Sequence, residues 1–154
     1  MKKLLPISLR MLIVGFSMLL FSSVQGRAQS VSDVELIKQT ALDYLEGWYE
    51  GNAERMERAL HPELAKRIVR TSPEGRSRLD QMGALTLVQS TRRGGGKDTT
   101  KEKQLKDVTI LDLYENVASV KIVASDWIDY LHVAKFNGRW VIVNVLWELK
   151  PAKK

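Results

Sequence analysis

The chain has 154 residues, which by length is one domain, and it contains no cysteine. The lack of cysteine excludes disulfides, thiolate metal sites and a cysteine nucleophile, so the hydrophobic core alone has to hold the fold. Removal of the first 28 residues would leave 20 basic against 18 acidic residues, a net charge of +2. That charge is too small for the electrostatic footprint of a general nucleic-acid-binding protein.

The first 28 residues have the order of a secretory signal peptide. Three basic residues precede an uncharged apolar run from Met11 to Phe21, and small residues follow at Gly26 and Ala28. We expect cleavage after Ala28, with cleavage after Gly26 as an alternative. An uncleaved membrane anchor is the other alternative, but the uncharged run is shorter than the roughly 20 residues that span a bilayer. The sequence therefore predicts a periplasmic or secreted domain, residues 29–154, that is free of the membrane after cleavage.

Two helices are predicted at the start of the mature chain. Ser32 and Glu35 have the spacing of a capping box, and an apolar stripe with spacings of three and four residues follows them. Gly51 and Asn52 end this helix, because both residue types tolerate a positive φ. Asn52 can also cap a second, short helix from Ala53 to about Leu60.

The middle of the chain has weaker signals. The residue before Pro62 avoids the α conformation, so the second helix should end there. Residues 64–69 fit either a helical turn or a short strand, and residues 71–77 predict a loop. Apolar residues three apart predict a short helix over residues 84–90. The basic, glycine-rich segment 92–106 predicts a mobile loop or a hairpin tip, with contact to an anion or a membrane surface as the alternative.

The last third of the chain has the composition of a β-sheet, rich in β-branched and aromatic residues. Asn137-Gly138 is its strongest hairpin signal, whereas one long bent strand through Ser125-Asp126 is an alternative to a turn there. Helices followed by an antiparallel meander predict an α+β fold. The expected strands lie near residues 105–114, 117–124, 128–136 and 139–149.

The strand at residues 139–149 is apolar on both faces. Either a partner covers the second face, or the sheet curls around a cavity. The first interpretation predicts a homodimer through the sheet.

Five blocks of residues, taken as a set and in this order, resemble one protein family. They are residues 43–52 (DYLEGWYEGN), 56–67 (MERALHPELAKR), 118–121 (ASVK), 129–133 (DYLHV) and 137–147 (NGRWVIVNVLW). The set is similar to the putative lumazine-binding family of the nuclear transport factor 2-like superfamily. The resemblance implies a cystatin-like cone, in which N-terminal helices pack in a curved antiparallel sheet with a pocket at its mouth. Ketosteroid isomerase, the SnoaL-like polyketide cyclases and scytalone dehydratase share that cone.

The resemblance brings five residues forward as candidates for ligand binding: Tyr44, Trp48, Asp129, Tyr130 and Trp147. In the cone the first helix closes the pocket, so its two aromatic residues could touch a ligand; core packing is the alternative. Asp129 shares a strand face with apolar neighbours, where an acid can act as a base or donor. The alternative for Asp129 is a turn-flanking residue bonded to backbone amides.

The two histidines give no catalytic signature. His61 precedes Pro62 and fits a helix stop, with a general base as the alternative. His132 is three residues from Asp129, so a regular strand places the two on opposite faces and they cannot form a dyad. We assign no catalytic residue, no metal site and no cofactor from the sequence.

Three functions remain open. The preferred one is an exported domain that binds a small apolar or aromatic molecule without catalysis. The alternatives are a small enzyme of the isomerase, dehydratase or cyclase type, which rests on fold analogy, and a domain for dimerisation or protein contact.

Overall fold

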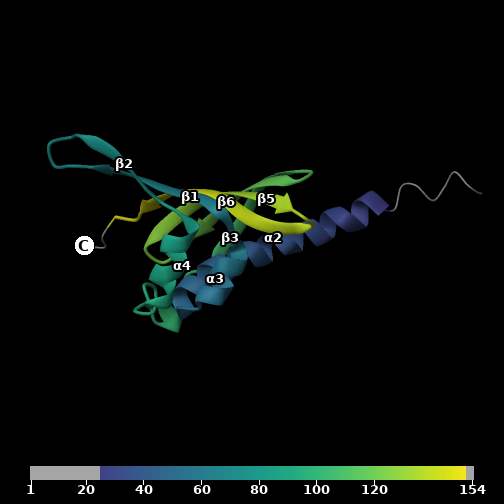
Figure 1. Cartoon of the computed structure of the whole chain (residues 1–154), viewed down its shortest axis with the longest axis horizontal. Coiled ribbons are helices and arrows are strands. Elements are labelled where there is room, and N and C mark those ends of the chain that lie inside the picture. The colour runs from purple at the N-terminus through teal and green to yellow at the C-terminus, as the bar shows by residue number, and fades with distance from the viewer. Residues whose placement is uncertain (1–24, 152–154) are drawn as a thin grey trace, which may run out of the picture. The chain divides into compact units, whose positions relative to one another are not determined.

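The computed structural model describes the backbone of residues 25–151 and the side chains of residues 33–151. The signal peptide expected over residues 1–28 lies outside the described residues except for the backbone of residues 25–28. No helix in the described part is long and apolar enough to cross a bilayer. Figure 1 labels most of the elements along the chain. Their bounds are α2 (Gln25–Glu50), α3 (Ala53–Ala59), β1 (Leu60–Thr71), β2 (Ser77–Met82), α4 (Ala84–Arg92), a short 3-10 turn (Lys101–Lys103), β3 (Asp107–Tyr114), β4 (Val117–Val123), β5 (Trp127–Phe136) and β6 (Arg139–Leu149).

Helix α2 begins at Gln25, so the predicted start at Ser32 is wrong for this chain. Ser32 therefore lies inside the helix and not at its N-terminus. The C-terminal end agrees with the prediction, because Gly51 has a φ of +65°. Asn52 then caps α3, its side chain accepting a hydrogen bond from the amide of Arg55 at 3.0 Å.

An ion cluster holds α2 to α3. The buried carboxylate of Asp43 accepts hydrogen bonds from Arg55 Nε at 2.8 Å and from Arg58 Nε at 3.0 Å. Burial by itself would raise the pKa of Asp43, but the two guanidinium groups outweigh burial and hold it below its usual range. Arg55 also pairs with Glu46 and Glu50 further along α2.

Residues 64–69 belong to strand β1, which settles the choice between a helical turn and a strand. Strand β2 follows after the predicted loop and pairs antiparallel with β1. Figure 1 shows this hairpin extending beyond the rest of the sheet. The predicted helix over residues 84–90 is α4. The apolar residues three apart that predicted it are Leu79, Met82, Leu85 and Val88; the first two lie in β2, and Gly83 separates β2 from α4.

One sheet with the strand order β2-β1-β6-β5-β4-β3 contains all the strands of the described residues. The four strands predicted in the last third are confirmed within two residues as β3 to β6. Asn137 and Gly138 both have positive φ, 50° and 78°, as a tight hairpin requires. A turn at Ser125-Asp126 separates β4 from β5, so the single bent strand is wrong. The sequence did not predict that β1 pairs parallel with β6.

A bulge in β6 explains why this strand is apolar at both even and odd positions. Val143 is an extra residue relative to the partner strand β5. Before the bulge Trp140 and Ile142 pack in the core, and after it Val145 and Trp147 do so. Even-numbered residues of β6 therefore face the core before the bulge, and odd-numbered residues face it after the bulge.

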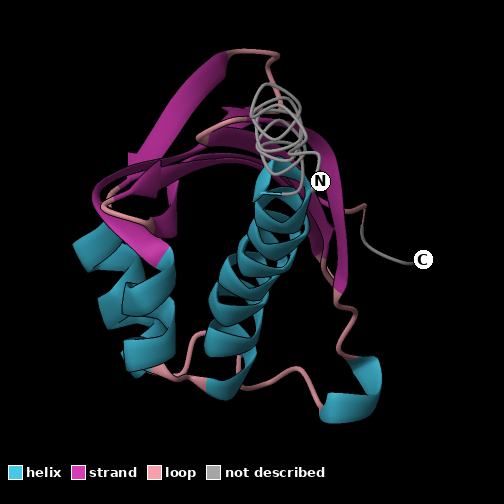
Figure 2. Cartoon of the chain, turned by 90° about the vertical axis from the view of Figure 1, so that its right-hand side faces the viewer, coloured by secondary structure: helices cyan, strands magenta, loops and turns pink. Residues whose placement is uncertain are grey.

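The curved sheet bends over the helices, as Figure 2 shows. Residues of α2 pack beneath it, with Ile37, Ala41 and Leu45 fully buried against the inward residues of β4, β5 and β6. The predicted α+β fold with helices packed in a curved sheet is confirmed.

Candidate functional site

Asp129 in β5 is fully buried and forms the centre of a polar network. Its carboxylate accepts hydrogen bonds from Trp127 Nε1 at 2.6 Å, from Lys66 Nζ at 2.7 Å and from Tyr44 Oη at 3.2 Å. Lys66 Nζ also donates to Tyr44 Oη at 2.6 Å. Three elements therefore meet at one carboxylate: α2, β1 and β5.

Successive side chains of a strand point to opposite faces of the sheet, and this alternation turns the groups from β1 and β5 inward. Trp127 and Asp129 share the inward face of β5, as the sequence predicted for Asp129. Lys66 occupies the inward face of β1 between Leu64 and Ile68, which are also buried. Sequence reasoning missed Lys66 because residues 64–69 fitted two structures. The available signal was a lysine between two apolar residues at strand spacing.

Burial and the ion pair set the charge state of the network. Burial raises the pKa of Tyr44 well above its ordinary value, and the negative charge of Asp129 raises it further. Burial lowers the pKa of Lys66, although the attraction of Asp129 partly offsets this effect. Tyr44 is thus a neutral hydroxyl, and Asp129 is the counterion that allows a lysine side chain only 7% exposed to stay in the core.

The network closes one side of a pocket of about 310 Å³. Its aromatic walls are Tyr44, Trp48, Trp127 and Trp147, and Lys66 reaches the lining while Asp129 lies behind it. Lys66 Nζ is 4.7 Å from the ring centroid of Trp147 and 5.3 Å from that of Tyr44, within cation–π range. The remaining lining residues are Met82, Leu87, Ser90, Gly95, Gly96, Asp98, Thr99, Asp126 and Leu149.

The glycine-rich segment packs against Trp48, which corrects the prediction of a mobile loop. A Cβ atom at Gly95 would lie 3.0 Å from Trp48 Cζ2, and one at Gly96 would lie 2.6 Å from Trp48 Nε1. Such approaches leave room for glycine only. The loop therefore forms a wall of the pocket, and Trp48 is at once a packing residue and a lining residue.

This arrangement agrees with a comparison of the sequence with protein families. The model of the family called "Putative lumazine-binding" matches residues 32–148. The chain belongs to this family. A comparison with curated protein sequences gives no match.

Solved structures support the same superfamily at the level of the fold. An NTF2-like protein with a cystatin-like fold from Novosphingobium aromaticivorans has a TM-score of 0.65 and 11% identity, covering 88% of this chain and 94% of that one. An NTF2-like protein of unknown function from Shewanella baltica has a TM-score of 0.61 and 16% identity, covering 79% and 97%. A "putative dehydratase from the NTF2-like family" from Streptomyces avermitilis has a TM-score of 0.54 and 12% identity, covering 80% and 99%.

In this member of the putative lumazine-binding family, Tyr130 does not line the pocket, contrary to the prediction. Its ring lies on the outer face of β5, 49% exposed, with Lys121 Nζ 5.9 Å from its centroid. Asp129 and Tyr130 are adjacent, so one strand cannot turn both toward the same face. The fold brings together at the pocket Tyr44, Trp48 and Trp147, with the carboxylate of Asp129 behind them. It leaves Tyr130 on the opposite face of the sheet.

Neither histidine reaches the pocket. His132 is on the outer face of β5, opposite in direction to Asp129 as expected, and contacts Asn144. His61 Nδ1 accepts from the amide of Glu63 at 3.2 Å, and the His61 ring packs on Phe136. Within residues 33–151 no group of three or more acidic, histidine or cysteine side chains could hold a metal ion.

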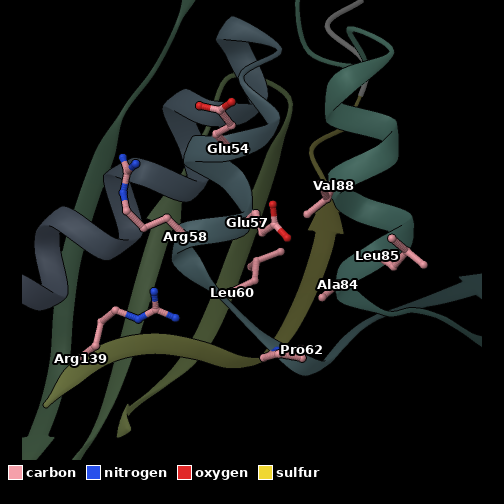
Figure 3. Close-up of a pocket in the computed structure, with 9 residues that line it drawn as sticks. All are labelled: Glu54, Glu57, Arg58, Leu60, Pro62, Ala84, Leu85, Val88 and Arg139. Atoms are coloured by element: carbon pink, nitrogen blue, oxygen red, sulfur yellow. The ribbon is translucent and has the colours of Figure 1, made fainter. Parts of the chain in front are cut away.

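A larger hollow of about 530 Å³ lies between α3, α4 and the start of β1. Figure 3 shows Arg58 and Arg139 on one side of it and Leu85 and Val88 across from them on α4. Its charged side chains are all exposed, and Arg58 is engaged by Asp43. The smaller pocket is the better candidate, because only there do buried polar groups meet aromatic walls.

Proposed function

We propose that this chain is an exported domain that binds a small, planar aromatic molecule in the pocket of about 310 Å³, without chemical change of the ligand. The observation that carries the proposal is the combination of four aromatic walls with a buried, ion-paired lysine. Binding sites for small molecules are typically apolar, with a few placed polar groups. The name of the family supports a ligand of this kind.

The geometry at Asp129 favours binding over catalysis. A general base has to come within hydrogen-bond reach of the proton that it removes. The carboxylate of Asp129 is occupied by three donors and lies behind the pocket lining. An enzyme of the isomerase, dehydratase or cyclase type remains the alternative, and it would have to use Lys66 or Tyr44 for proton transfer.

Ligand binding is expected to raise the melting temperature of the purified domain. A panel of flavin-like, pterin-like and steroid-like compounds should include planar compounds that stabilise the protein by RT ln(1 + [L]/Kd), about 2.7 kcal/mol at a hundredfold excess over Kd. Trp147→Ala should abolish the shift. Tyr114→Ala, which removes an exposed ring at the end of β3, should leave it unchanged.

A panel without any shift, together with a crystal structure in which side chains fill the pocket, would reject the proposal. The domain would then be one for dimerisation or protein contact.

The first 28 residues are proposed to direct export and to be removed. The protein recovered from the periplasm or medium should begin at Gln29, and intact-mass measurement checks this. A full-length chain that retains Met1 in the membrane fraction would instead indicate an anchor.

The outer face of the sheet is proposed to form a homodimer. Tyr130 and Leu146 are about half exposed there, next to the polar residues Arg67, His132 and Asn144, which are linked by hydrogen bonds. Sedimentation at micromolar concentration should give twice the monomer mass, and Leu146→Glu should shift it to the monomer. A wild-type monomer at that concentration would contradict the dimer.

A further inference from the structure

We infer that Lys66 holds an aromatic aldehyde or ketone in the pocket as a reversible imine, a covalent bond between its amine nitrogen and the carbonyl carbon of the ligand. This inference rests on the proposed function, since it names the class of ligand for the same pocket. It is compatible with binding without chemical change, because hydrolysis of the imine returns both the amine and the original carbonyl compound.

Lys66 supplies the only amine among the described residues that line the pocket. Its side chain keeps 7% exposure, whereas that of Asp129 behind it has none. Lys66 Nζ lies 4.7 Å from the ring centroid of Trp147 and 5.3 Å from that of Tyr44, and both rings are walls of the pocket. A flat ligand that packs on these walls can therefore present a carbonyl carbon to the amine.

The immediate surroundings of Lys66 Nζ supply the two proton carriers that imine formation requires. The carboxylate of Asp129 is 2.7 Å from Nζ, and the hydroxyl oxygen of Tyr44 is 2.6 Å from it. An amine attacks a carbonyl only in its neutral form, and desolvation in an apolar pocket is one way to favour that form. Burial lowers the pKa of Lys66 in this way, although the charge of Asp129 partly offsets the effect.

The protons balance within these three side chains. Lys66 transfers a proton to Asp129, and the lone pair of the neutral amine forms the C–N bond while the electron pair of the C=O π bond moves to oxygen. A proton passes from the nitrogen to that oxygen through the Tyr44 hydroxyl, which gives a carbinolamine. The proton held by Asp129 then leaves with the carbinolamine hydroxyl as water, and the nitrogen lone pair forms the C=N bond. The product is a protonated imine beside an ionised Asp129.

The buried ion pair favours carbonyl compounds over other electrophiles. The protonated imine keeps the positive charge next to Asp129, so the buried carboxylate retains its counterion. Acylation of Lys66 would instead give a neutral amide and would leave Asp129 buried and unpaired. Aldehydes and ketones are therefore the class that this pair accommodates, and a carbonyl conjugated with a ring stays planar, as the aromatic walls require.

Reductive trapping tests the inference. The protein is incubated at neutral pH with 2-naphthaldehyde and sodium cyanoborohydride, which delivers hydride to the imine carbon and leaves a stable secondary amine. Peptide mass mapping should locate the naphthylmethyl group at Lys66, formed about tenfold faster or more than at any exposed lysine. 2-Naphthylmethanol, which has the ring but no carbonyl, should bind in the pocket and slow the trapping at Lys66.

Three variants assign the roles. Lys66→Arg keeps a positive charge beside Asp129 but cannot form an imine, so it should bind 2-naphthylmethanol and show no adduct at this position. Tyr44→Phe keeps the amine and its counterion, and it should slow trapping by about tenfold or more. Lys121→Arg is the matched control, because Lys121 lies over Tyr130 on the outer face of the sheet and its replacement should leave trapping at Lys66 unchanged. Site mapping on the wild type keeps the test decisive if Lys66→Arg does not fold.

Binding of 2-naphthylmethanol without a selective adduct at Lys66 would overturn the inference and leave the proposed function intact. An adduct at Lys66 that 2-naphthylmethanol does not slow would also overturn it, because the aldehyde would then react from outside the pocket. The absence of both binding and selective trapping, in a protein that is folded by circular dichroism, would reject the proposed function together with the inference.

Discussion

Asp129→Ala is expected to lower the free energy of unfolding by about 3–5 kcal/mol, because it leaves the ammonium group of Lys66 buried without its counterion. It also removes the acceptor of the Trp127 indole N–H and of the Tyr44 hydroxyl. Urea unfolding followed by circular dichroism measures the change. The exposed pair of Arg70 and Asp80 supplies the control, since Asp80→Ala should cost at most about 1 kcal/mol.

The loss of stability in Asp129→Ala should depend on pH, in a direction set by the pKa of Lys66. Burial lowers the pKa of Lys66, and in the variant no carboxylate remains to raise it again. Between that lowered pKa and the ordinary lysine value of about 10.4, the unfolded state binds more protons than the native state, so stability rises with pH. The deficit of Asp129→Ala relative to wild type should therefore be smaller at pH 9 than at pH 6.

The double variant Asp129→Ala/Lys66→Met separates an unpaired charge from a lost contact. Removal of both charges should recover a large part of the stability, because well-packed apolar side chains can replace a buried ion pair. A double variant no more stable than Asp129→Ala, with the same stability at both pH values, would contradict the role assigned to Lys66.

Gly96→Ser is expected to push the glycine-rich loop away from Trp48 and to weaken ligand binding by tenfold or more. The added Cβ would lie within 2.6 Å of the indole nitrogen, and the loop supplies one wall of the pocket. Forced overpacking of this kind typically costs about 1–3 kcal/mol, which equilibrium unfolding would detect. Calorimetric or fluorescence titration with a compound that stabilises wild type would give the change in affinity.

Gly83→Ser is the matched control for this prediction. The nearest atom to a Cβ at Gly83 is the carbonyl oxygen of Leu64 at 3.8 Å, and Gly83 is the N-cap of α4, a position that serine suits. It should leave both stability and binding unchanged. In a Trp48→Ala background, Gly96→Ser should become less costly only in part, because the ring is gone but the backbone carbonyl oxygen of Trp48, 2.5 Å from the added Cβ, remains. Equal costs in both backgrounds would show that the Trp48 ring is not the obstacle.

Local patterns were enough to predict much of this protein. The apolar stripe of α2, the Asn52 cap and the Asn137-Gly138 turn depend on neighbours within a few residues, and each is confirmed. The inward direction of Asp129 follows from strand alternation alone. The same rule, applied to the next residue, would have excluded Tyr130 from the pocket.

Only the tertiary structure decided the composition of the site. The parallel pairing of β1 with β6 joins Leu60 to Ile142, and no local period contains information about partners so far apart in the chain. That pairing turns Lys66 inward, where a lysine is stable only because Asp129 lies 2.7 Å away. The close fit of Gly96 on Trp48 likewise depends on a contact between segments that the sequence separates. The periodicity of apolar residues specifies the helices and strands and their buried faces. Whether a charged side chain on such a face can be buried depends on which other element packs against it.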